Sequence, residues 1–119
     1  MLYSLKYTDE MAESTGGYAK AWFIRIRPKY REDVGIHEHE KVHVWQWWRT
    51  LWLHSLLYLC FKSYRLAAEV EAYREQLKHA PATNDPERYR QMYAGFISDP
   101  DPVKGYGLKI TKEEVLKRL

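Results

Sequence analysis

The sequence has little that would crosslink the chain or hold it in a membrane. Cys60 is the only cysteine, so no intramolecular disulfide can form, and the apolar residues around it, 57–61, predict a buried thiol. The most apolar run, 51–61, has about half of the roughly 20 residues that a membrane-spanning helix needs, and His54 interrupts it. We therefore expect a buried helix there and no transmembrane segment.

The charges are also not concentrated in any block of one sign. The 19 basic and 16 acidic residues give a net charge of +3 and are spread along the chain, which argues against a nucleic-acid partner. Residues 1–6 lack a basic region followed by an apolar stretch, so we expect no signal peptide and a cytoplasmic location. With 119 residues, 45% of them hydrophobic and 29% charged, the chain is expected to form one domain, 1–119.

Glycine and proline are absent from the 45 residues between Ile36 and Ala80. This length far exceeds an average helix, so the sequence predicts two helices, roughly 36–51 and 63–79, with a break between them that can hold a shorter helix. Asp33 is the predicted N-cap of the first helix.

Shorter elements are predicted on both sides of this helical region. A strand over 1–7 and a second over 18–27, in which Trp22, Ile24 and Ile26 alternate with arginines, predict a short antiparallel β-hairpin or small sheet at the N-terminus. A turn-rich linker, 81–86, precedes a helix over 87–97, and a capping box at Thr111 opens a last helix. The fold class is therefore expected to be α+β and mainly helical.

The strongest chemical signal is the pentapeptide His39-Glu40-Lys41-Val42-His43, an H-E-x-x-H motif. Two histidines four residues apart rise about 6 Å along a helix and leave from one face, so both imidazoles can bind one Zn²⁺. Glu40 lies near the metal without having to ligate it, and can take a proton from the attacking water and pass it to the leaving amine. His37 has no such partner, because the residue four positions after it is Lys41.

A catalytic zinc site needs a third protein ligand and keeps a fourth position open. The helix predicted over 63–79 offers Glu69 and Glu71, the first of them 26 residues after His43. The two glutamates differ by about 200° around a helix, so only one of them can face the metal.

The segments His39–Gln46 and Glu69–Arg74 resemble small gluzincin-type zinc metallopeptidases of bacteria and phages, including the minigluzincins, over roughly residues 22–77. The resemblance implies a zincin-like fold, Zn²⁺ as cofactor and a peptide or protein substrate. It also implies Glu69 as the third ligand, because the ligand glutamate of gluzincins usually precedes a small residue by three positions, here Ala72. Glu71 is the reserve choice.

Two further expectations come from the same resemblance. An edge strand binds extended substrate by strand addition, and 18–27 is the candidate here. Many gluzincins carry aspartate where this chain has Tyr73, so the resemblance does not supply a hydrogen-bond partner for a ligand histidine.

Several other features have structural interpretations. The tryptophans at 45, 47, 48 and 52 cover too much of a helix to lie in the core alone. Most are expected in the core, and some against a partner or substrate. Gln46 is expected in a structural hydrogen bond, and His54 and His79 as ordinary surface or core histidines.

The favoured function is a zinc metallopeptidase with Glu40 as general base, and the main alternative is a catalytically silent, zinc-stabilised binding or structural domain. A third hypothesis is a membrane-surface or oligomerising helical protein that works through the aromatic run 45–61. The arginines at 25 and 27 could favour acidic substrates and the tryptophans apolar ones, so the sequence selects neither a substrate nor an oligomeric state.

Overall fold

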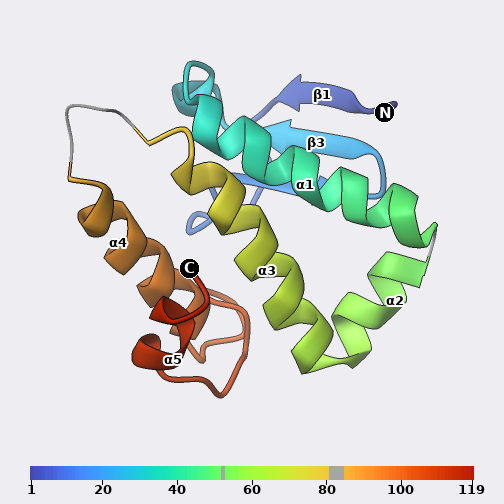
Figure 1. The fold of residues 1–119 in the computed structure, drawn as a ribbon. Helices are drawn as coiled ribbons and strands as arrows, with labels where there is room; N and C mark the ends of the chain where they lie inside the picture. Colours follow the sequence, from blue (N-terminus) through green and yellow to red (C-terminus); the bar gives the residue numbers. More distant parts are fainter. Residues whose placement is uncertain (52, 81–84) are drawn as a thin grey trace.

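The chain has an α+β fold in which a small N-terminal sheet packs on one long helix and the other helices follow it (Figure 1). The computed structural model describes residues 1–51, 53–80 and 85–119. Within these ranges it contains five α-helices and a three-stranded sheet, as the sequence predicts for the fold class.

The sheet contains β1 (Ser4–Tyr7), β2 (Gly17–Lys20) and β3 (Phe23–Ile26) in the order β1-β3-β2. The central strand β3 pairs antiparallel with β2, as predicted, but in parallel with β1, so the expected antiparallel arrangement is wrong for the first strand. The prediction of one strand over 18–27 is therefore wrong: Ala21, at a φ of 53°, turns the chain between two strands. Only the part of this segment in β2 lies at an edge of the sheet.

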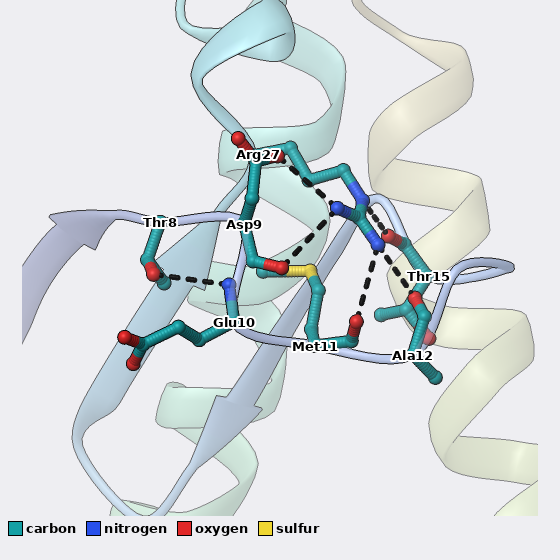
Figure 2. Close-up of polar contacts among 7 residues, drawn as sticks. All are labelled: Thr8, Asp9, Glu10, Met11, Ala12, Thr15 and Arg27. Carbon is teal, nitrogen blue, oxygen red and sulfur yellow. Dashed lines mark hydrogen bonds and ion pairs between the residues drawn. The ribbon is translucent and has the colours of Figure 1, made fainter.

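Arg27 closes the loop between β1 and β2, as Figure 2 shows. Its guanidinium donates hydrogen bonds to the carbonyl oxygens of Thr15, Ala12 and Met11, and forms an ion pair with Asp9 at 3.1 Å. With these partners the side chain is 13% exposed. The contacts of Arg27 thus give it a structural role in this loop.

The long helical region divides into α1 (Val34–Thr50), α2 (Leu53–Cys60) and α3 (Lys62–Leu77), which confirms the predicted helices and the break between them. A short 3-10 helix, η1 (Pro28–Tyr30), leads into α1. The predicted N-cap is also confirmed, because the Asp33 carboxylate accepts a hydrogen bond from the Ile36 amide at 3.1 Å. The chain leaves α1 at Leu51, where φ is 55°, and turns between α2 and α3 at the extended residue Phe61.

The C-terminal part adds α4 (Pro86–Ser98) and α5 (Lys112–Leu116). Thr111 caps α5 by accepting a hydrogen bond from the Glu114 amide at 3.2 Å, as predicted. Most of the predicted linker, 81–84, lies outside the described residues.

Two clusters of buried apolar side chains stabilise the fold. The first joins the sheet to α1, and the second joins α3 and α4 to the C-terminal segment. Their fully buried members are Ile24, Ile26 and Val44 in the first, and Ala94, Ile97 and Val115 in the second. The contact between α1 and α3 lies between these clusters, and the predicted metal ligands meet there.

The expectation of a buried helix over 51–61 is wrong for most of its described residues, which are exposed. Leu56 is 53% and Leu59 74% exposed, and the thiol of Cys60, predicted to be buried, is exposed as well. The physical reason is that α2 turns its more polar face, with His54 and Tyr58, towards α1 and α3. The apolar residues are left on the outside.

The tryptophans also lie nearer the surface than predicted. Trp45 is 51% exposed and Trp48 36%, while Trp47 is partly buried against Trp22. Trp52 lies outside the described residues. None of the helices in the described ranges is long and apolar enough to cross a membrane.

Candidate metal centre

Three of the residues predicted as metal ligands meet between α1 and α3. His39 and His43 extend from one face of α1, and Glu69 reaches them from α3. The two Nε2 atoms lie 3.2 Å apart, and the Glu69 Oε1 lies 3.5 Å from that of His39 and 3.3 Å from that of His43. The side chains are 6%, 11% and 2% exposed, so the group is almost completely shielded from solvent.

These three distances fit a tetrahedral zinc ion. With bonds of 2.0–2.1 Å, the ligand atoms of a tetrahedral zinc site are about 3.3–3.4 Å apart. In the described part of the chain, Glu69 Oε1 is buried without a hydrogen-bond partner. A buried carboxylate oxygen without a donor is costly, and a cation bound between these atoms would satisfy it. The residues present therefore fit the metal that the sequence predicts.

The reserve ligand Glu71 is placed elsewhere. Its carboxylate lies 3.6 Å from the Arg49 guanidinium, and its side chain is 43% exposed. His37 is also outside the group, because its ring bonds the Tyr7 hydroxyl at 3.0 Å and the Asp33 carbonyl at 2.6 Å. Of the alternatives that the sequence left open, the structure brings only Glu69 to the histidines.

Gln46 connects the two helices that carry the ligands. Its Oε1 accepts a hydrogen bond from His43 Nδ1 at 2.9 Å, and its Nε2 donates to the Ala68 carbonyl at 3.0 Å. The first bond places the proton of a neutral His43 on Nδ1 and leaves Nε2 free to ligate a metal. The second fixes the backbone next to Glu69. The structural hydrogen bond predicted for Gln46 thus lies at the site itself.

Sequence reasoning missed two residues of α2 at this site. The Tyr58 hydroxyl donates a hydrogen bond of 2.5 Å to Glu69 Oε2, which leaves Oε1 facing the histidines. The His54 ring lies 6.3 Å from the ring of His43 and bonds the Tyr64 hydroxyl at 2.8 Å. Their spacing of four residues, which puts both on one face of an otherwise apolar helix, is the signal that could have identified them.

The environment of His39 differs from that of His43. Among the described residues its Nδ1 is buried and has no hydrogen-bond partner. The Tyr73 ring packs edge-on against the imidazole, with ring centroids 4.3 Å apart, and the Tyr73 hydroxyl bonds the Tyr106 hydroxyl at 2.9 Å. Tyr73 therefore holds His39 by ring packing.

The burial of these groups shifts their protonation equilibria. Burial alone would raise the pKa of Glu69, but the neighbouring His43 and His39 outweigh it and hold this pKa well below its usual range. Burial lowers the pKa of His43, yet the Glu69 carboxylate raises it to about 9. Burial raises the pKa of Glu40, an effect that the two histidines partly offset. Metal binding would therefore displace a proton from His43 at neutral pH.

A second group with ligand-like spacing lies on the surface. It consists of Glu38, Glu75 and His79. Both carboxylates pair with lysines at 2.9 Å, and the three side chains are 28–34% exposed. Exposure and existing partners make this group a much weaker candidate than the one between α1 and α3.

Comparison with known proteins yields no relative: no family model matches the chain, and neither a curated protein nor a solved structure matches it significantly.

Proposed function

We propose that the chain is a zinc-dependent metallopeptidase, with His39, His43 and Glu69 as ligands and Glu40 as general base. The observation that supports the proposal is the triangle formed by the three ligand atoms, whose sides measure 3.2–3.5 Å. One of these atoms, Glu69 Oε1, is buried and has no hydrogen-bond partner in the described part of the chain. Two histidine nitrogens from one helix and a carboxylate oxygen from another, all within bonding reach of one point, form the three-ligand arrangement that a catalytic zinc site uses.

The roles of the residues follow from this arrangement. When bound, zinc supplies Lewis acidity that makes a water nucleophilic near neutral pH. Glu40 is buried next to both histidines, where its carboxylate can take the proton of the attacking water and pass it to the leaving amine. Gln46 and Tyr58 hold His43 and Glu69 in orientation.

A peptide substrate would be bound as an extra strand at the edge formed by β2. The central strand β3 is occupied on both sides, whereas β2 pairs only with β3 and packs against α1, the helix that carries the motif. An extended peptide could add to this edge by backbone hydrogen bonds.

The burial of the site also favours a second candidate function, a zinc-stabilised binding or structural domain without turnover. His39 and Glu40 are each 5% exposed and Glu69 is 2% exposed. A scissile peptide needs direct access to the metal and to Glu40, so turnover requires a displacement of neighbouring groups that a structural zinc site does not need.

Replacing Glu40 by glutamine separates the two functions. For the peptidase, Glu40→Gln keeps its zinc and loses at least about 100-fold of its activity on an unfolded protein substrate. Glu38→Gln is the matched control, because Glu38 lies two residues away and pairs with Lys41. Equal activity of Glu40→Gln and the native chain would overturn the peptidase proposal. Bound zinc with no cleavage by the native chain would favour the structural domain.

A further inference from the structure

The outward side of α2 exposes several large apolar side chains. Leu53 is 42%, Leu56 53% and Leu59 74% exposed, and Phe61 directly after the helix is 55% exposed. We call these four residues the outer α2 face. Figure 1 shows α2 at a corner of the molecule, where it joins the ends of α1 and α3.

The polarity of α2 is the reverse of that of an ordinary surface helix. At 100° per residue, Leu53, Leu56 and Leu59 fall within about 120° of each other, and His54 and Tyr58 fall on the opposite side. The inward side makes the polar contacts to Tyr64 and Glu69, while α2 itself contains no charged residue. Such a helix keeps its apolar side outward at a cost, which indicates a partner for that side.

The segment of the chain that contains α2 carries charges of one sign only. The 28 residues between Glu40 and Glu69 contain four lysines and arginines and no acidic residue, although the whole chain has 16 acidic residues. Arg49 and Lys62, both exposed, lie on either side of α2. Arg49 pairs with Glu71 of α3 at 3.6 Å, but the segment itself carries basic charges alone. An apolar helix face flanked by such residues complements a surface with negative headgroups above hydrocarbon.

Chemistry and area both favour a lipid surface over a second copy of the chain. The outer α2 face offers no hydrogen-bond donor or acceptor in its side chains, so nothing in it specifies a protein partner. Its exposed area is on the order of 400 Å², about half of the roughly 800 Å² that each partner of a stable protein interface buries.

From these observations we propose that the outer α2 face docks the protein on the surface of an anionic membrane, with Arg49 and Lys62 at the headgroups. Docking uses none of the metal ligands, so the test of docking does not depend on whether the chain is a peptidase. It places the metal centre next to the membrane surface, because the inward side of the same helix contacts Glu69 through Tyr58.

Cys60 allows the docking to be measured where it occurs. It is the only cysteine, is exposed and follows Leu59 on α2, so an environment-sensitive fluorophore on its thiol reports on this helix alone. We expect its emission to rise and shift to the blue on vesicles of phosphatidylcholine mixed with phosphatidylglycerol. Phosphatidylcholine alone should give a much smaller change. A fluorophore that responds to neither vesicle would overturn the proposal.

Paired variants of the labelled protein test the residues involved. Leu59→Asp should lower binding to the anionic vesicles at least about tenfold. Val103→Asp should leave this binding unchanged. Val103 is 75% exposed and Leu59 74%, and the substitution adds the same negative charge at a position outside the outer α2 face. Far-ultraviolet circular dichroism checks that both variants are folded. Equal binding by the two variants would contradict the proposal, as would a lipid-free dimer of the native chain that Leu59→Asp dissociates.

Discussion

At the scale of single residues, Gln46 is the uncharged side chain on which the geometry of the site most depends. It is 1% exposed and bonds both His43 and the backbone beside Glu69. Gln46→Met keeps its volume and removes both bonds, so we expect zinc affinity to fall about 10- to 100-fold. Competition with a chromophoric chelator measures the loss. Gln91→Met is the control, because Gln91 lies on α4 and bonds Glu87 there. Equal affinities would contradict the role assigned to Gln46.

His54 gives a prediction about pH. Burial and the nearby His43 lower its pKa to about 4 in the folded chain, from an ordinary value of 6.5. Between these pH values the unfolded state binds more protons than the folded state, so acid favours unfolding. The contribution of neutral His54 to the free energy of unfolding is therefore complete above pH 6.5 and is lost as the pH falls towards 4. Urea unfolding of the metal-free protein should show this loss, and His54→Phe should show less of it.

The comparison for this experiment is His79→Asn, which removes an exposed histidine at the end of α3. A difference in unfolding free energy between native protein and His54→Phe that stays constant from pH 6.5 to 4 would contradict the assignment.

How far the site could be predicted depended on whether its residues share a local pattern. His39, Glu40 and His43 follow from helix periodicity, since the spacing itself places them together. The choice between Glu69 and Glu71 required the packing of α3 on α1, which periodicity does not give. The hydrogen bond from Tyr58 to Glu69 depends on the turn at Phe61 that folds α2 back onto α3, and no pattern in the sequence sets that angle.

At the scale of elements, the loop between β1 and β2 depends on Arg27. Arg27→Met keeps the length of the side chain but removes the donor of three loop carbonyl groups, two of them in partly buried hydrogen bonds. We expect the free energy of unfolding in urea to fall by about 2 kcal/mol, with zinc content unchanged. Arg88→Met, a change of an exposed arginine on α4, should have little effect; a similar loss in both variants would show that the loop does not need Arg27.

The elements themselves were largely predictable, for local reasons. The N-caps Asp33 and Thr111 set the starts of α1 and α5, and the lack of glycine and proline in 36–80 set the extent of the helical region. The division of 18–27 into two strands was missed because the turn contains no glycine: Ala21 itself adopts a positive φ. The exposure of α2 was missed because apolar content predicts burial unless one side of a helix lacks a partner.

At the scale of the whole molecule, the candidate metal centre lies where the two halves of the core meet. One half joins the sheet to α1, and the other joins α3 to α4 and the C-terminal segment. His39 and His43 belong to the first half and Glu69 to the second, so an ion bound by all three would tie the halves together. Metal binding at such a position contributes to folding as well as to chemistry.

The central claim is therefore tested most directly by the zinc content of the purified protein, measured by elemental analysis without prior exposure to chelator. The native chain should contain about one zinc, His43→Ala and Glu69→Ala should lose most of it, and Glu71→Ala should keep it. Glu71 is the matched control, because it lies two residues from Glu69 and pairs with Arg49. No zinc above background in the native chain, or equal zinc in all four proteins, would contradict the claim.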